Sequence, residues 1–157
     1  MSLEIERKFL VKDTSFIEKS YQKNFIKQGF LNSNKNRVVR VRVLDNKSFL
    51  TIKGVSNSTG TTRYEWENEI SLLEGEQLLL LCEKKIIEKH RYLIKNKMHT
   101  FEVDVFLNEN KGLIIAEIEL NSEGEKFEKP SWLGDEVTGQ IKYYNSSLSK
   151  NSFKEWL

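Results

Sequence analysis

The chain has 157 residues and a formal net charge of +2, although 31% of its residues are charged. This length favours a single domain over residues 1–157, and the small net charge leaves little general attraction to nucleic acid. The single cysteine, Cys82, excludes a disulfide framework within the chain, and the leucine-rich run beside it is too short to span a bilayer. We therefore expect a cytoplasmic protein that binds neither membrane nor nucleic acid.

Alternation of apolar and polar residues at every second position predicts about eight strands. They lie near residues 3–11, 25–31, 38–44, 47–54, 62–70, 86–95, 99–107 and 113–121. Turn residues such as Asp45 and Asn46 join neighbouring strands by short links, which favours antiparallel pairing. Helical patterns are fewer, and they lie near residues 15–19, 72–84 and 122–127 and after Tyr143.

Each predicted strand places charges of mainly one sign on one face. Residues i and i+2 of a strand point to the same side, so Arg40 and Arg42 share a face opposite Val39, Val41 and Val43. The other strands repeat this pattern, with cations at Lys8, Lys53, Lys89 and Arg91 and with acids at Glu4, Glu6, Glu65, Glu67, Glu69, Glu102, Asp104, Glu117 and Glu119.

Two architectures explain these faces. In an open antiparallel sheet, the charged face meets water and the apolar face forms the core. In a closed barrel, the apolar face lies outside under the helices and the charged face lines the interior. The barrel accounts better for long charged residues where Thr, Ser and Gln are common. Because unpaired buried ions cost several kcal/mol each, such an interior predicts a bound polyanion, with phosphates on the Arg and Lys side and divalent cations on the carboxylates.

Over nearly its whole length, the chain resembles the short bacterial members of the CYTH superfamily, also called triphosphate tunnel metalloenzymes. The hallmark Glu-x-Glu-x-Lys is Glu4, Glu6 and Lys8, and similar strings follow in order at residues 28–31, 40–42, 51–53, 63–67, 88–92, 101–106, 116–119 and 132–138. The resemblance implies an α+β, mainly β fold, in which helices pack outside a closed eight-stranded antiparallel β-barrel. It also implies a Mg²⁺ or Mn²⁺ requirement and a small-molecule triphosphate substrate, and it leaves a homodimer open.

The resemblance and the strand faces together suggest a role for each charged residue. We expect the metal to be held by Glu4, Glu6, Asp104, Glu117 and Glu119. We expect the phosphate chain to be clamped by Lys8, Arg40, Arg42, Lys53, Arg63, Lys89, Arg91 and Lys142. Catalysis is expected to use Lys8 together with a water molecule that Glu65 or Glu67 positions for attack on the terminal phosphorus. For the metal-binding carboxylates the simpler alternative is that they are surface acids on an edge strand, and for the cations it is cross-strand salt bridging.

The sequence departs from the family pattern near its C-terminus. Relatives usually carry Asp-x-Arg-Tyr, whereas this chain has Gln140, Ile141, Lys142 and Tyr143. Lys142 keeps the charge but lacks the planar fork of Arg, so this wall is expected to hold phosphate more loosely.

Several functions are compatible with these features. Hydrolysis of inorganic tripolyphosphate or of a nucleoside triphosphate is the leading hypothesis. Class IV adenylate cyclase, which makes cyclic AMP and pyrophosphate from ATP, is the first alternative, although no motif fixes adenine. Thiamine triphosphatase and a noncatalytic module that binds polyphosphate or a nucleotide are the others.

Overall fold

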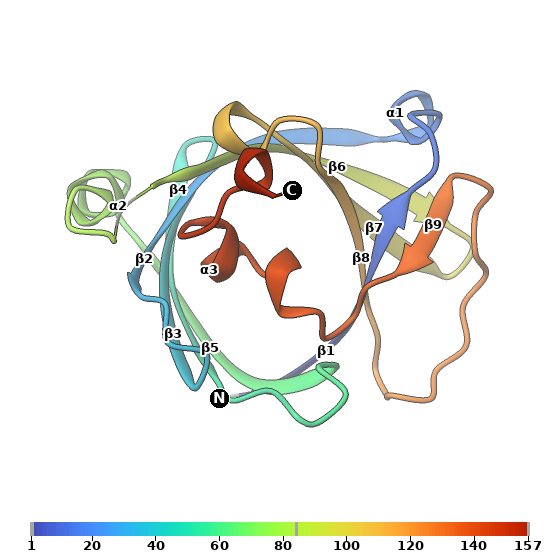
Figure 1. Cartoon of the computed structure of the whole chain (residues 1–157), viewed down its shortest axis with the longest axis horizontal. Helices are drawn as coiled ribbons and strands as arrows, with labels where there is room; N and C mark the ends of the chain where they lie inside the picture. Colours follow the sequence, from blue (N-terminus) through green and yellow to red (C-terminus); the bar gives the residue numbers. More distant parts are fainter. Residues whose placement is uncertain (1, 84, 157) are drawn as a thin grey trace.

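The computed structural model describes residues 2–83 and 85–156, and its main feature is an antiparallel sheet that closes on itself (Figure 1). Its strands follow the order β5-β4-β3-β2-β6-β7-β8-β1, and a pairing between β1 and β5 completes the ring. The predicted closed eight-stranded barrel is therefore confirmed. The strands are β1 (Ser2–Val11), β2 (Gln22–Asn32), β3 (Arg37–Leu44), β4 (Lys47–Gly54), β5 (Thr62–Ile70), β6 (Ile87–Asn96), β7 (His99–Phe106) and β8 (Ile114–Glu119).

Strand β1 closes the barrel. Its first residues pair with β5, where Glu4 lies opposite Arg63, and its later residues pair with β8, where Lys8 lies opposite Glu117. A short ninth strand, β9 (Leu133–Glu136), pairs with the end of β1 at an irregularity in the register. The alternation pattern does not predict β9, because four residues are too few to establish a period. The charged side chains of β1 thus lie at the junction of the two halves of the barrel.

One of two apolar clusters lies outside the barrel, between the strands and the segments that cover them. Phe9, Phe101 and Ile118 are fully buried in one cluster with Trp132. The rings of Phe101 and Trp132 meet edge to face, with centroids 5.3 Å apart. Lys8, the neighbour of Phe9, points to the other side of the sheet and is only 7% exposed. The predicted inversion, with apolar side chains outside and charges inside, is therefore confirmed for this cluster, whereas Phe30 and Val38 of a second cluster face the lumen.

The helices are short and few. They are α1 (Phe16–Lys19), α2 (Leu72–Leu79), η1 (Asn108–Asn110), η2 (Ile141–Tyr143), α3 (Asn145–Leu148) and η3 (Phe153–Glu155). Helix α2 covers the outside of β3 and β4, and it begins at a capping box between Ser71 and Glu74. It ends well before the end of the predicted range 72–84, because turn hydrogen bonds spaced three residues apart replace the helical ladder. One residue of that range lies outside the described part of the chain.

The helix predicted over residues 122–127 is wrong. This segment runs as turns and extended chain, and its polar side chains bond to other parts of the molecule. The carboxylate of Glu123 accepts hydrogen bonds from Asn57 Nδ2 and Thr61 Oγ1 at 2.9 and 2.6 Å. The carboxylate of Glu125 lies 2.6 Å from His99 Nε2. These distant partners replace the local hydrogen bonds that a helix would have made.

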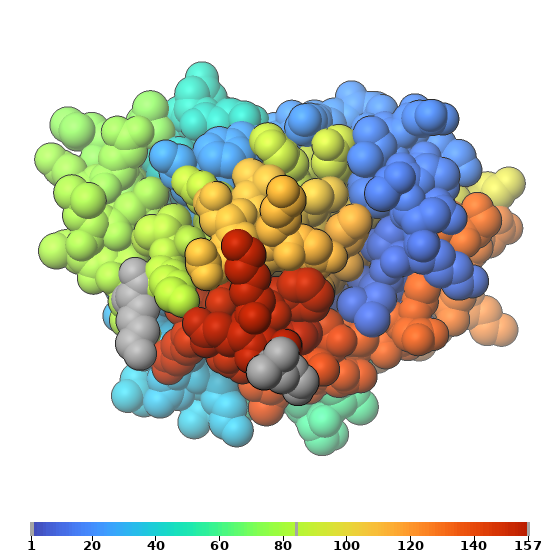
Figure 2. Space-filling view, turned by 45° about the horizontal axis from the view of Figure 1, so that its top comes forward, coloured from blue at the N-terminus to red at the C-terminus, as the bar shows by residue number. Residues whose placement is uncertain are grey.

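The C-terminal segment, which contains η2, α3 and η3, crosses one end of the barrel (Figure 1). Tyr143 and Leu148 pack with Phe30 and Val38 in a second apolar cluster. In the space-filling view this segment, in red, lies flush against the neighbouring strands and loops (Figure 2). The helix predicted after Tyr143 is therefore present, but α3 lies over the lumen, whereas the helices were expected outside the barrel.

Among the helices formed by residues 2–83 and 85–156, none combines the length and the apolar character needed to cross a membrane.

Candidate active site

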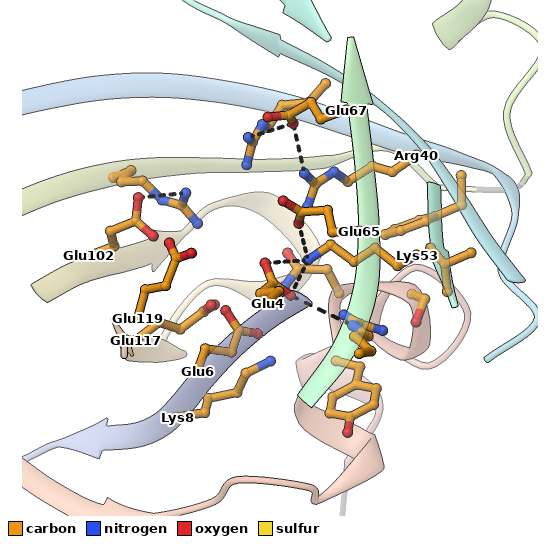
Figure 3. Close-up of a pocket in the computed structure, with 18 of the residues that line it drawn as sticks. Glu4, Glu6, Lys8, Arg40, Lys53, Glu65, Glu67, Glu102, Glu117 and Glu119 are labelled. Carbon is orange, nitrogen blue, oxygen red and sulfur yellow. Dashed lines mark hydrogen bonds and ion pairs between the residues drawn. The ribbon is translucent and has the colours of Figure 1, made fainter. Parts of the chain in front are cut away.

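Charged side chains from most strands of the barrel line one central cavity of about 180 Å³ (Figure 3). Period-two alternation places them there, because each strand turns every second residue toward the lumen. The structure brings together most of the residues that the sequence predicts for the site. These are Glu4, Glu6, Lys8, Arg40, Arg42, Lys53, Arg63, Glu65, Glu67, Lys89, Arg91, Glu117 and Glu119.

Lys53 on β4 joins two acidic strands. Its Nζ lies 2.9 Å from Glu4 Oε1 on β1 and 3.3 Å from Glu65 Oε2 on β5. Arg63 Nε lies 3.7 Å from the same Glu4 oxygen. Each of these side chains is largely buried, so the ion pairs are shielded from bulk water. Where β1 pairs with β5, the cations and carboxylates of the cavity therefore hold one another in place through ion pairs.

Two arginines on β3 reach the cavity with hydrogen-bonding capacity to spare. Arg42 Nη2 and Arg40 Nη2 lie 3.4 and 3.7 Å from Glu67 Oε1. The Nε atoms of both arginines are buried and have no hydrogen-bond acceptor in the structure. Burial, followed by repulsion from Arg40, lowers the pKa of Arg42 to about 9. Buried, unsatisfied guanidinium donors favour an incoming anion with several oxygen atoms, such as a phosphate.

The opposite wall of the cavity is acidic. Glu6 on β1 lies opposite Glu119 on β8, and the next inward position on β8 is Glu117. Burial raises the pKa of Glu117, and the neighbouring Glu6 raises it further. Burial also raises the pKa of Glu119, with Glu4 as the strongest of several acidic neighbours. These carboxylates crowd one another without enough local positive charge.

Asp104 does not line the cavity, which changes the role expected for it. Its side chain is 1% exposed and forms a bidentate pair with Arg91, at 2.7 and 2.9 Å. Its second oxygen also lies 2.8 Å from Lys89 Nζ. Despite burial, these two cations hold the pKa of Asp104 well below its usual value. Because Asp104 lies outside the cavity lining and both of its oxygens contact these cations, we assign it to orienting Lys89 and Arg91.

Lys142 also lies outside the residues that line the cavity. Its Nζ sits over the rings of Trp156 and Tyr143, at 4.8 and 5.2 Å from their centroids. Residues 141–143 form a 3-10 turn at the surface of the C-terminal segment. The structure therefore does not bring Lys142 to the phosphate-binding cations. The weaker phosphate contact that was expected at Lys142 is not part of this cavity.

The cavity also contains residues that were not predicted for the site. Glu102 lies two residues from Asp104 on the same face of β7, so strand parity already pointed to it. Tyr144, Asn145 and Ser146 come from the C-terminal segment, and the Asn145 side chain accepts hydrogen bonds from Lys89 Nζ and Gln28 Nε2 at 2.9 and 2.7 Å. No strand periodicity could reveal these three, because they enter the barrel from outside the sheet.

The residues present fit a divalent metal that is shared with a substrate. Within the described ranges, no three His, Cys, Asp or Glu side chains form a ready-made cage. Mg²⁺ in phosphate-processing sites usually takes only one or two carboxylates and completes its shell with phosphate oxygens and water. Glu6, Glu117 and Glu119 supply hard oxygen donors, and a cation between them would offset the repulsion that raises the pKa values of Glu117 and Glu119.

Comparisons with known proteins agree with this geometry. A curated protein of Acetivibrio thermocellus named inorganic triphosphatase is 48% identical over 158 residues, which cover 99% of each chain. One from Nitrosomonas europaea with the same name is 33% identical over 150 residues, covering 93% of this chain and 96% of its own. A crystal structure described as an inorganic triphosphatase superposes with a TM-score of 0.67 at 32% identity, covering 93% and 97% of the two chains. The CYTH domain model matches residues 2–152, and the chain therefore belongs to the CYTH domain family.

Proposed function

We propose that the protein is a divalent-metal-dependent triphosphatase that hydrolyses inorganic tripolyphosphate inside the barrel. The observation that carries this proposal is the pairing of buried, unsatisfied arginine donors with a crowded acidic wall in one cavity. The arginine donors bind phosphate oxygens, and the acidic wall binds the cations that accompany the phosphates. Both relatives described above are named inorganic triphosphatases, which supports the same substrate.

The charge balance of the cavity supports a requirement for metal. Its described lining comprises seven cations and seven carboxylates, so the lining alone is close to neutral. A triphosphate adds about four negative charges, which would leave the filled cavity strongly negative in a medium of low dielectric constant. Divalent cations that enter with the substrate would restore neutrality. We therefore propose Mg²⁺ or Mn²⁺ as the cofactor, held by Glu4, Glu6, Glu117 and Glu119.

The phosphate chain would bind to cations from both halves of the barrel. Arg40 and Arg42 present unsatisfied Nε donors, and Lys89 and Arg91 are held in place by Asp104 before any substrate arrives. Donors that are fixed in advance stabilise the charge that develops in the transition state without further reorganisation. Lys8, Lys53 and Arg63 complete the set of cations that we assign to substrate binding.

Hydrolysis requires a water molecule placed in line with the scissile bond. Glu65 and Glu67 on β5 lie beside the cations and are the carboxylates that we assign to orienting this water. A bound divalent cation would polarise the phosphate oxygens and neutralise the charge on the leaving group. The reaction needs no nucleophilic side chain, and we place it in the cytoplasm, in keeping with the free thiol of Cys82.

The decisive experiment measures all products from three substrates. The purified protein is incubated with tripolyphosphate, ATP or thiamine triphosphate in Mg²⁺, Mn²⁺ or EDTA, and orthophosphate, pyrophosphate and cyclic AMP are quantified. We expect tripolyphosphate to yield orthophosphate and pyrophosphate only when a divalent cation is present. Arg42→Ala is expected to lower kcat/KM by at least about 100-fold, whereas Lys150→Ala, a change at an exposed lysine, is the matched control. Cyclic AMP with pyrophosphate from ATP, or full activity in EDTA, would overturn the proposal.

A further inference from the structure

Lys8 differs from the other cations that line the central cavity. Each of the others lies within 4.0 Å of at least one carboxylate, as described for Arg40, Arg42, Lys53, Arg63, Lys89 and Arg91. In the described part of the chain, no carboxylate lies that close to Lys8 Nζ. The residue is nevertheless only 7% exposed. Lys8 is thus a buried ammonium group whose charge is not neutralised by a direct ion pair.

The acidic residues nearest to Lys8 in the sheet do not form an ion pair with it. Glu117 lies directly opposite Lys8 in the pairing of β1 with β8, and burial together with the neighbouring Glu6 raises its pKa, yet its carboxyl group forms no ion pair with Lys8 among the described residues. The backbone of Lys8 is also fixed, because its N–H donates to Thr138 Oγ1 at 2.9 Å and its carbonyl accepts from the Val137 N–H at 2.8 Å. The backbone of Lys8 is therefore fixed, whereas its long side chain still needs a contact that holds the ammonium group.

The ring of Tyr144 supplies that contact. Lys8 Nζ lies 4.8 Å from the ring centroid, within the range of a cation–π interaction. Arg63 Cζ lies 5.7 Å from the same centroid. An aromatic face attracts a cation through its quadrupole and leaves the full positive charge available to other ligands. A carboxylate in the same place would instead cancel the charge that a phosphate needs.

Tyr144 is held at this point by the packing of two loops. Gly60 and Gly139 both have φ of +78°, and a Cβ at Gly60 would lie 2.4 Å from Gly139 Cα and 3.2 Å from the Tyr144 hydroxyl oxygen. Tyr144 also lines a second cavity of about 260 Å³ at the surface, next to the central one. Lys8, Arg63 and Tyr144 also line a small pocket together with Gly60 and Gly139, so the ring lies where the charged lumen meets these two loops.

We infer that Tyr144 is a positioning residue that holds the unpaired Lys8 ammonium group in the cavity, ready to bind a phosphate oxygen. This inference rests on the proposed triphosphatase function. Without the ring, the flexible lysine side chain would turn toward Glu6 or Glu117 and form an ion pair. Its charge would then be lost to the substrate both in binding and in the transition state.

The test compares Tyr144→Leu, which removes the aromatic face, with Tyr144→Phe, which keeps the face and removes only the hydroxyl group. We expect kcat/KM for tripolyphosphate to fall about tenfold in Tyr144→Leu and to stay within about twofold of wild type in Tyr144→Phe. Tyr21→Leu makes the same replacement at a tyrosine that is 54% exposed and remote from the cavity, and it is expected to behave as wild type. Thermal unfolding of each variant shows that the fold is retained.

A second readout follows the lysine itself. In an NMR spectrum with ¹³C-labelled lysine, ring current from Tyr144 should shift the Hε resonance of Lys8 upfield, and Lys8→Arg assigns the signal. This shift should persist in Tyr144→Phe and disappear in Tyr144→Leu. Equal losses of activity in the Leu and Phe variants, or a Lys8 signal that is the same in wild type and Tyr144→Leu, would overturn the inference. A wild-type protein without tripolyphosphatase activity would overturn the proposed function, while the NMR comparison would still decide the Lys8–Tyr144 contact.

Discussion

Asp104→Asn is the most informative single substitution, because it removes one charge from the most buried ion cluster of the barrel. The Asp104 carboxylate is 1% exposed, and it contacts Lys89 Nζ at 2.8 Å and Arg91 at 2.7 and 2.9 Å. Asparagine has nearly the same shape, but it cannot accept from both cations with a full negative charge. Lys89 and Arg91 would then lose the negative charge that they share, and Arg91 would keep only its pair with the more exposed Glu102.

The expected loss of stability is large. Removing one partner of a buried ion pair costs about 3–5 kcal/mol, because the remaining charge is left uncompensated. For a chain of this length, each kcal/mol lowers Tm by about 2–4 °C. We therefore expect Asp104→Asn to lower Tm by roughly 6–20 °C. Tripolyphosphate should restore more stability to this variant than to wild type, since its oxygens can replace the missing negative charge.

The assay is thermal unfolding, followed by circular dichroism with and without tripolyphosphate. Glu102→Gln is the matched control, because Glu102 pairs with the same Arg91 at 3.2 Å but its side chain is 40% exposed. A pair this exposed contributes about 1 kcal/mol or less. Equal shifts of Tm for the two variants would refute the buried-cluster reasoning. A normal Tm with a large loss of Mn²⁺ affinity in Asp104→Asn would instead restore the metal-ligand role.

Three further predictions concern charge crowding, protonation and the loop contact. Glu6→Gln should raise the Tm of the metal-free protein at neutral pH by about 2–4 °C, because it removes a charge beside the buried Glu117. In a thermal scan with Mn²⁺, the same variant should lose most of the stabilisation that the metal gives to wild type. Burial lowers the pKa of Lys89 to about 8, and a bound polyanion would raise it again. Tripolyphosphate binding should therefore take up protons and weaken as pH rises through this range, which calorimetry in two buffers of different ionisation enthalpy measures. Gly60→Ala should lower the free energy of unfolding, measured by urea denaturation, by at least about 1 kcal/mol, because Gly60 has a positive φ and a close backbone neighbour. Gly124→Ala is the control, since no atom lies within 4 Å of its new Cβ, and it should be near neutral.

Each of these expectations has an outcome that contradicts it. A lower Tm for metal-free Glu6→Gln would show that Glu6 stabilises the cavity on its own. Identical binding enthalpies in the two buffers would show that no proton accompanies the polyanion near pH 8. Equal stability of the two glycine variants would show that the Gly60 loop is free to move away from its neighbour.

Period-two alternation of apolar and polar residues predicted most of the fold from the sequence. It placed eight strands near their observed positions, because the side to which a strand residue points depends only on its neighbours in sequence. It failed for the segment 122–127, where Glu125 contacts His99 and Glu123 contacts the loop near Asn57. It also missed β9, which exists because β1 offers a free edge there.

The sequence by itself determined which side chains face the lumen and how their charges are sorted. Depth along the barrel was decided only by the tertiary structure. Glu102 and Asp104 share one face of β7, yet strand register leaves one at the opening and encloses the other between Lys89 and Arg91. The closure of β1 against β5 and the entry of Tyr144 depend in the same way on contacts between residues far apart in the chain. Local periodicity contains no information about such contacts, because they arise from the packing of the whole barrel.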